Sequence, residues 1–164
     1  SHKTWGRYLE ASPETAETSG LPWKKLPFND RANPLYVNTS ITAQRQRVAA
    51  KLIGMGEINT LKIVRRYGTG SYAARYTQRL VLNGHDDWFL PSVDELDEMY
   101  NFMHANLIPI DGTHNTFYWS SSEYDYNNAW TINFKDGQEF DREKYLVPGP
   151  GVKALRIRAI RAFG

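Results

Sequence analysis

The stretch "HDDWFLPSVDELDEMY", residues 85–100, concentrates six carboxylates in a short segment. Two carboxyl groups that converge on one cleft at about 5–10 Å can hydrolyse a glycosidic bond by acid–base chemistry. Asp94 and Glu98 are four residues apart and would share one face of a helix. Together with Glu123 they define a hydrolase hypothesis.

The same acids also have a structural explanation, which the sequence favours. Ser92 followed by Glu95 matches a capping box, in which the two side chains bond each other's backbone N–H groups at a helix start. Asp94 and Glu95 fall in the first turn, where the helix dipole stabilises negative charge. The apolar residues that follow have helical spacing and predict one buried stripe: Leu96, Met99, Tyr100 and Met103. The carboxylates at 86–87 precede Trp88 and are typical of a turn.

A second segment, residues 118–145, is dense in Tyr, Trp, Ser and Asn, the residue types of antibody paratopes and of sugar-binding faces. Strand periodicity assigns four of its residues to the core: Trp119, Trp130, Ile132 and Phe134. The remaining residues fall in loops or on the polar phase, and we expect them to form a ligand-binding face: Tyr124, Tyr126, Asn127, Asn128, Asn133, Lys135, Arg142, Lys144 and Tyr145.

Other catalytic or cofactor chemistry finds little support. The four histidines are scattered without metal-ligand spacing, and the chain has no cysteine for disulfides, thiolate metal sites or nucleophilic catalysis. The "GTGS" at 68–71 lacks the lysine of a phosphate-binding loop and predicts a plain loop before a helix. The serine run at 120–122 has no evident base partner. We therefore expect no metal and no cofactor.

The composition bounds the partners. A net charge of +2 arises from 20 basic and 18 acidic residues that are interspersed, so nucleic acid is not an expected partner. No apolar run approaches the roughly 18 residues of a transmembrane helix. A chain of 164 residues with 41% hydrophobic residues fits one domain, residues 1–164.

The elements that would position these residues begin with helices. After a short strand at 5–11, a helix from Ile41 is predicted to end at Gly54. A second helix over 57–67 is expected to be capped by Asn59. A third, over 72–82, is expected to be capped by Ser71 and stopped at residues 83–84, and the helix from Ser92 completes the set.

Strands follow the helices. We predict them at 117–120, 129–135 and 155–163, with a hairpin turn at residues 136–137. The period breaks at Ile160, which indicates a bulge or a strand covered on both faces. Helices followed by antiparallel strands are typical of an α+β fold.

Three arginines in the last strand, at 156, 158 and 161, have two interpretations. The favoured one makes them buried partners for the acids of the 94–98 helix. The alternative places them on a basic surface.

Six blocks occur in the order of a known family: "WGRYLEASP", "IGMGEINTLKIV", "NGHDDWFLPSVDELDEMY", "YWSSSEY", "NNAWTINFKDG" and "RIRAIRAF". With these blocks the chain resembles the bacterial Lcl C-terminal domain family, named after a collagen-like adhesin. The resemblance implies a C-type-lectin-like fold with two main helices, small antiparallel sheets, and N- and C-terminal strands that come together. The chain departs from the family pattern in two places. It lacks a strand upstream of "WGRYLE", which suggests a truncated N-terminal strand. Residues 28–47 match the pattern poorly, and we interpret them as an insertion.

The resemblance also implies function. Family members are surface-displayed or secreted bacterial binding modules, and some are the variable proteins of diversity-generating retroelements, whose substitutions would map to residues 123–153 here. The calcium-ligand motifs of true C-type lectins are absent, so calcium-dependent sugar binding is not expected, and the cysteines that the related formylglycine-generating enzymes need are missing.

We therefore expect a non-enzymatic, extracellular or surface-displayed domain that binds a protein or glycan ligand. One alternative is an adhesin that recognises sulfated polysaccharide through four cations: Lys135, Arg142, Lys144 and Lys153. The hydrolase with Asp94, Glu98 or Glu123 is the other.

Overall fold

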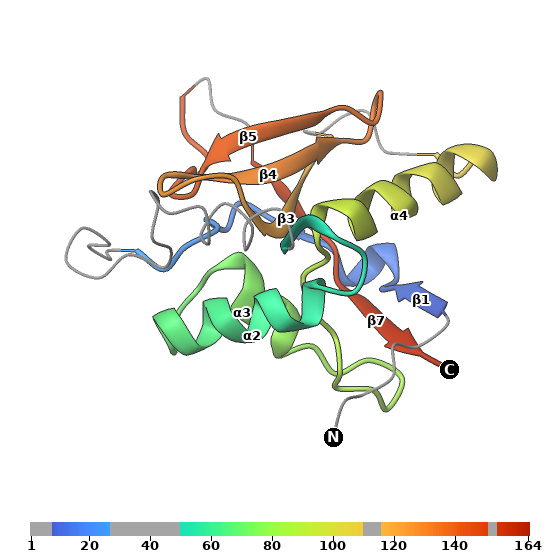
Figure 1. The fold of residues 1–164 in the computed structure, drawn as a ribbon, viewed down its shortest axis with the longest axis horizontal. Helices are drawn as coiled ribbons and strands as arrows, with labels where there is room; N and C mark the ends of the chain where they lie inside the picture. The colour runs from blue at the N-terminus through green and yellow to red at the C-terminus, as the bar shows by residue number, and fades with distance from the viewer. Residues whose placement is uncertain (1–7, 27–49, 110–115, 151–153) are drawn as a thin grey trace.

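The computed structural model describes residues 8–26, 50–109, 116–150 and 154–164 (Figure 1). The first described elements are strands β1 and β2 with a short 3-10 helix between them: β1 (Tyr8–Ala11), η1 (Glu14–Ala16) and β2 (Thr18–Ser19). Three α-helices follow: α2 (Gly56–Tyr67), α3 (Ala73–Gln78) and α4 (Val93–Ala105). The remaining strands are β3 (Phe117–Glu123), β4 (Asn128–Asn133), β5 (Glu139–Glu143), β6 (Arg156–Ile157) and β7 (Ile160–Phe163). This order confirms the predicted α+β class.

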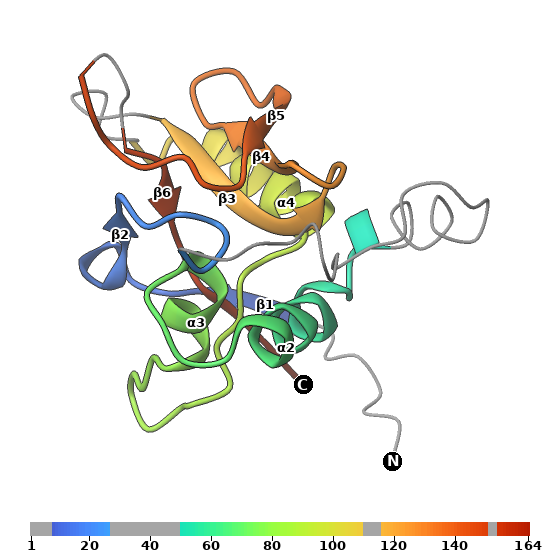
Figure 2. The same cartoon turned by 90° about the vertical axis from the view of Figure 1, so that its left-hand side faces the viewer.

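The strands form two sheets. β1 pairs antiparallel with β7, so the first and last described strands lie side by side, as the resemblance implied. The other sheet has the order β2-β6-β3-β4-β5 (Figures 1 and 2). Because β3 and β6 run parallel where Tyr118 meets Arg156, this sheet is mixed, and the prediction of purely antiparallel sheets is wrong for it.

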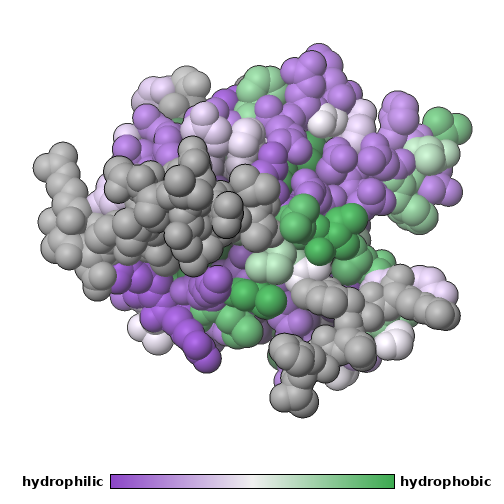
Figure 3. Space-filling view, in the orientation of Figure 1, coloured by the Kyte–Doolittle hydropathy of each residue, from purple (hydrophilic) through white to green (hydrophobic). Residues whose placement is uncertain are grey.

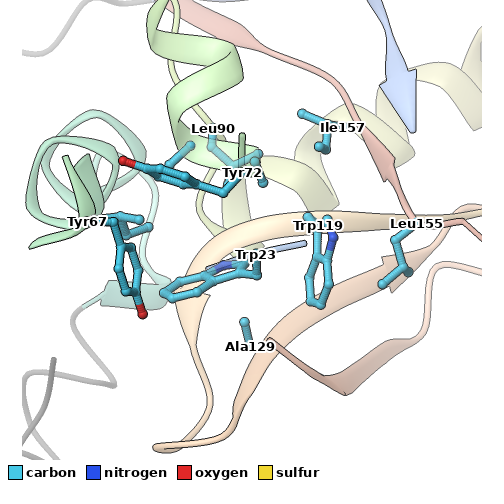
Figure 4. Packing of buried hydrophobic residues seen from close by; sticks show 11 residues of the cluster. Trp23, Tyr67, Tyr72, Leu90, Trp119, Ala129, Leu155 and Ile157 are labelled. Atoms are coloured by element: carbon cyan, nitrogen blue, oxygen red, sulfur yellow. The ribbon is translucent and has the colours of Figure 1, made fainter. Parts of the chain in front are cut away.

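The central strand β3 is covered on both faces. Trp119 belongs to a buried cluster with residues of α2 and α3, and Tyr118, its neighbour in sequence, belongs to a second cluster with residues of α4. Figure 4 shows the first cluster, in which the ring of Trp23 lies between those of Tyr67 and Trp119. The indole N–H of Trp23 donates to the Ser120 carbonyl at 2.8 Å. Successive side chains of a strand point to opposite faces, so β3 supplies aromatic residues to both halves of the core.

Helix α4 begins as the capping box predicted. Ser92 Oγ accepts from the Glu95 N–H at 3.3 Å, and Glu95 Oε2 accepts from the Ser92 N–H at 2.7 Å. The predicted stripe packs against the sheet, with Leu96 fully buried, Met99 and Met103 nearly so, and Tyr100 partly buried.

Helix α2 begins earlier than predicted, at Gly56, and Asn59 is not its cap. Asn59 lies inside the helix and is 1% exposed. Its Nδ2 donates to the Ala50 carbonyl at 2.8 Å and to Ser121 Oγ at 3.2 Å. Asn is a common cap residue, but here its amide joins α2 to β3, a tertiary contact that local sequence does not reveal.

Helix α3 is also shifted and shorter. Tyr72 stands at its N-cap without a capping side-chain bond, so Ser71 is not the cap, and the helix ends at Gln78. Asn83 and Gly84 both have positive φ, 52° and 76°, and form a two-residue turn that joins the bridged residues Leu82 and His85. Asn-Gly is favoured in such turns, so this signal marked a turn and not the end of the helix.

The remaining predictions of elements divide as follows. The hairpin turn at 136–137 is confirmed, with β4 and β5 paired on either side and Gly137 at φ 76°. The predicted strand 155–163 is split into β6 and β7, which belong to different sheets, and this explains its broken period. Gly54 has φ 98°, consistent with the end of a helix at Ala50 and Lys51. The rest of that helix, residues 5–7 of the first strand and the insertion at 28–47 lie outside the described residues.

Candidate functional site

One end of the mixed sheet is built from two turns, the connection between β3 and β4 and the turn that follows β5. It lies at the left of Figure 1, opposite the β4–β5 hairpin. Asp125 organises the first turn, because its carboxylate accepts from the N–H groups of Asn127 and Asn128, each at 2.8 Å. The side chain of Asn128 also donates to Asp125, at 3.0 Å. The connection is therefore fixed by its own side chains.

Lys144 anchors the second turn to the first. Its ammonium group is ion-paired with Glu123, donates to the Tyr126 carbonyl at 2.9 Å and lies 4.9 Å from the centre of the Trp23 ring. Its backbone N–H donates to the Asn127 carbonyl at 2.8 Å, and its carbonyl accepts from Trp23 and Lys24. Lys144 is 1% exposed, so its predicted place on the ligand face is wrong. It is a buried anchor, because the ion pair with Glu123 compensates the burial of its charge.

Two tyrosines are exposed at this end. Tyr124 is 42% exposed and lies edge-on to Trp130, with ring centres 4.8 Å apart. Tyr145 is 46% exposed, and Lys24 lies 5.8 Å from the centre of its ring. A hydrogen bond with Glu143 raises the pKa of the Tyr145 hydroxyl. We call the exposed residues of the two turns, Tyr124, Asn127 and Tyr145, the tyrosine surface, with Trp130 against Tyr124 and Lys24 near Tyr145.

Trp130 is less buried than predicted. It is only partly covered, on the side of the α4 cluster, and Lys51 Nζ lies 4.4 Å from its ring centre. Lys51 is in turn ion-paired with Glu139 at 3.1 Å. The other three predicted core residues of this segment, Trp119, Ile132 and Phe134, are 0–2% exposed, as expected. Trp130 thus lies partly exposed between Tyr124 and Lys51.

Tyr126 and Asn128 help to hold the turn in place and contribute little exposed surface to the site. Tyr126 is partly buried, and its hydroxyl oxygen is enclosed. The amide of Asn128 is held by Asp125, as described above. Of the residues predicted in this turn, Tyr124 and Asn127 are the exposed ones.

Three of the predicted face residues lie elsewhere. Asn133 and Lys135 are at the far end of β4, about 17 Å from Asn128 at the rise of a strand. Asn133 accepts from Thr116 Oγ1 at 2.5 Å and from the Lys135 N–H at 3.0 Å, so it shapes the hairpin. Arg142 lies opposite Ala129 in the strand register, on the face that Trp130 does not share, and stacks 4.6 Å from the ring centre of Phe117.

The four cations of the sulfated-polysaccharide hypothesis do not gather into one patch in the described structure. Lys144 is buried, Lys135 and Arg142 occupy different places on the sheet, and Lys153 lies outside the described residues.

Figure 3 shows the surface over β4 and β5 as mostly hydrophilic, with hydrophobic residues gathered around the start of α2. The exposed apolar side chains there are Leu52, Ile53, Ile58 and Leu61.

The carboxylates of the hydrolase hypothesis are divided among separate roles. Glu123 is 1% exposed and paired with Lys144, so a substrate from solvent cannot reach it. Glu98 is exposed on α4, and Asp94 is partly buried, with a pKa that burial raises. Glu95 is buried and accepts from Ser92, from Gly54 at 2.8 Å and from Gly56 at 3.4 Å. Burial raises the Glu95 pKa in spite of these bonds.

The sequence matches a protein-family model. The model of the Lcl C-terminal domain matches residues 15–148, well over half of the chain and the whole of the tyrosine surface. The chain belongs to the Lcl C-terminal domain family. Among curated proteins, none matches it.

In this Lcl C-terminal domain the arginines of the last strands are neutralised by acids that sequence reasoning did not pair with them. Arg156 and Arg158 lie 3.2 and 4.0 Å from the carboxylate of Glu17. Arg161 bridges Glu10 at 3.0 Å and Asp87 at 2.8 Å. Both earlier interpretations are therefore wrong, since the partners lie in the N-terminal segment and in the turn before Trp88. The hydroxyl of Tyr118 joins the first network, and burial raises its pKa to about 12.

Sequence reasoning missed Lys24 and Lys51 as neighbours of the tyrosine surface. The only signal for Lys24 was its place directly after Trp23, and none marked Lys51.

In the described parts of the Lcl C-terminal domain, no three acidic or histidine side chains group closely enough to hold a metal ion. None of its described helices is long and apolar enough to cross a membrane.

Proposed function

We propose that this Lcl C-terminal domain is a non-enzymatic ligand-binding domain that recognises a protein through the tyrosine surface. The observation that carries the proposal is the pair of exposed tyrosines, Tyr124 and Tyr145, on turns that buried groups hold in place. Tyrosine gives a large contact area with little loss of side-chain entropy, and the fixed turns lower the ordering that binding would require.

The fold that we infer for this domain is C-type-lectin-like. Three features support it: the pairing of the first and last described strands, β1 with β7, two main helices, α2 and α4, and a mixed sheet with long antiparallel hairpins on its outer side. The antiparallel pair β3–β4 presents the turn that carries Tyr124.

At this end of the sheet the exposed residues differ from the residues that hold the backbone, an arrangement that suits a variable protein. Tyr124, Asn127 and Tyr145 lie within residues 123–153, where the family resemblance would place substitutions. Asp125, Glu123 and Lys144 support the backbone beneath them. Exposed residues could change without disturbing these anchors, and we infer display at the bacterial surface or secretion for such a module.

A protein ligand is favoured over a sulfated polysaccharide because the predicted cations are dispersed. An aromatic-anchored contact should tolerate salt, whereas polyanion binding through exposed lysines and arginines should weaken steeply as ionic strength rises.

The test is binding of the purified domain to a panel of bacterial surface proteins and to a glycan array, each at low and at high salt. We expect a protein hit that persists at high salt and is weakened at least about tenfold by Tyr124→Ala, the loss typical of an aromatic hot spot. Tyr8→Ala is the matched control, because Tyr8 is also an exposed tyrosine, 59% exposed, but lies on β1 against Phe163.

Equal effects of the two substitutions would contradict the proposal. Binding only to sulfated glycans, lost at high salt, would instead assign the binding site to exposed lysines and arginines.

A further inference from the structure

A cavity lies between β2 and α3, apart from the tyrosine surface. It has a volume of about 440 Å³, within the size range of small-ligand pockets. Its lining comes from β2, the loop before α3 and α3 itself: Thr18, Leu21, Gly70, Ser71, Tyr72, Arg75, Tyr76, Arg79 and Leu80. Figure 2 places α3 below β2 on the same side of the molecule. No lining residue belongs to the tyrosine surface.

The charged residues that line this cavity are all cationic. Arg75 and Arg79 are four residues apart and therefore share one face at the α3 end, while no carboxylate is among the lining residues. In the part of the chain that the structure describes, neither arginine forms an ion pair, whereas Arg156, Arg158 and Arg161 all do. Among the described residues, these two cations of the cavity thus have no acidic partner.

Arg75 is held in a position suited to a ligand. Its Nη1 donates to Gln78 Oε1 at 3.0 Å, a neutral partner that orients the guanidinium without cancelling its charge. Its Nε is enclosed, yet within the described ranges no acceptor bonds it. A buried donor without an acceptor is unfavourable, and an anionic oxygen would satisfy it.

The lining also contains apolar and aromatic residues. Leu21 and Leu80 line the cavity together with the rings of Tyr72 and Tyr76. The Tyr72 hydroxyl donates to the Gly68 carbonyl at 2.5 Å, and the Tyr76 hydroxyl donates to the Ala16 carbonyl at 2.9 Å. Tyr72 is fully buried and forms the wall behind the cavity. Tyr76 is only partly buried, and because its hydroxyl is already bonded, it offers the hydrocarbon of its ring to a ligand in a fixed position.

We propose that this cavity binds a small organic carboxylate with a ring, the carboxylate at Arg75 and Arg79 and the ring against Tyr76 and the two leucines. A guanidinium fits a planar carboxylate with two parallel hydrogen bonds, which favours this group beside the arginines. The apolar lining residues favour an organic body over a bare inorganic anion.

The test is calorimetric titration of the whole domain at constant ionic strength with benzoate and with glucuronate. The uncharged counterparts are benzamide and methyl glucoside, and inorganic sulfate and phosphate are the ring-free anions. We expect saturable binding of at least one of the two carboxylates. Its uncharged counterpart should bind at least about tenfold more weakly, because a charge-assisted hydrogen bond is lost. Absence of saturable binding for both carboxylates, or equally tight binding of sulfate, would overturn the proposal.

Variants place the site. Arg75→Gln is expected to weaken the binding at least about tenfold, and the more exposed Arg79→Gln a few-fold. Arg65→Gln is the matched control, because Arg65 is exposed on α2 and does not line the cavity. Since Arg79 is exposed, its variant should fold even if Arg75→Gln does not. Wild-type affinity in the folded Arg79→Gln variant, or an equal loss in Arg65→Gln, would overturn the assignment.

Discussion

The start of α4 and the tyrosine end of the sheet are each organised around a buried glutamate, and they stabilise it differently. Glu95 and Glu123 are both 1% exposed. Glu95 is surrounded by three neutral backbone donors, from Ser92, Gly54 and Gly56. Among the described residues, Glu123 has a single charged partner, Lys144. A carboxylate held by several neutral donors survives the loss of one, whereas a carboxylate held by one cation depends on it entirely.

The largest effect should come from breaking the charged arrangement. Lys144→Met leaves Glu123 buried without its cation, and we expect a loss of about 3–5 kcal/mol in the free energy of unfolding, measured by urea denaturation. The double variant Glu123→Gln with Lys144→Met should be more stable than the single one, because it buries no unpaired charge. A single-variant loss below about 1 kcal/mol would mean that the pair behaves like a surface ion pair.

A smaller loss is expected at the start of α4. Glu95→Gln keeps one acceptor oxygen but turns an NH₂ group toward a backbone N–H, so the unfolding free energy should fall by about 1–3 kcal/mol. Glu98→Gln on the exposed side of the same helix is the control, with an expected change within about 0.5 kcal/mol. Equal values for the two variants would show that the capping box contributes little.

The smallest effect concerns an acid that is neither buried nor alone. Hydrogen bonding to Arg161 lowers the pKa of Asp87 below its ordinary value. A lowered pKa in the folded state contributes stability above the pKa of the unfolded chain, about pH 4, and this contribution disappears as the pH falls.

We therefore expect Asp87→Asn to lose at most about 1 kcal/mol at pH 7, in line with exposed ion pairs, and to match the wild type at pH 2. Urea denaturation at both pH values checks this. A difference that grows on acidification would contradict the assigned sign.

What the sequence could predict was local. The Ser92–Glu95 box, the apolar stripe of α4 and the Asp-Gly hairpin depend on residues within one or two turns of each other, and the structure has all three. Lys144 could not be placed, because its charge is compensated by Glu123, 21 residues away across the β4–β5 hairpin. Asn59 was wrongly predicted as a cap for the same reason, since its amide makes tertiary contacts with Ala50 and Ser121.

The strand alternation was a partial guide. It placed Ile132 in the core correctly but implied a solvated opposite face, whereas Thr131 on that face is fully buried and donates to the Phe140 carbonyl at 2.9 Å. A sheet covered on both faces hides polar residues that a one-sided sheet would expose. Exposure, and with it the tyrosine surface, therefore had to come from the structure.

The carboxylate of Glu95 also links the motions of two helices. Its oxygens hold the N–H groups that precede and open α2 as well as the one that opens α4, and Gly56 lies so close that an added Cβ would come within 2.2 Å of Oε2. Because one carboxylate bonds both helix starts, opening at either start takes away part of what holds the other. In hydrogen exchange, the amides of Gly54, Gly56 and Ser92 should thus exchange as one cooperative unit, at a common rate set by a single opening event.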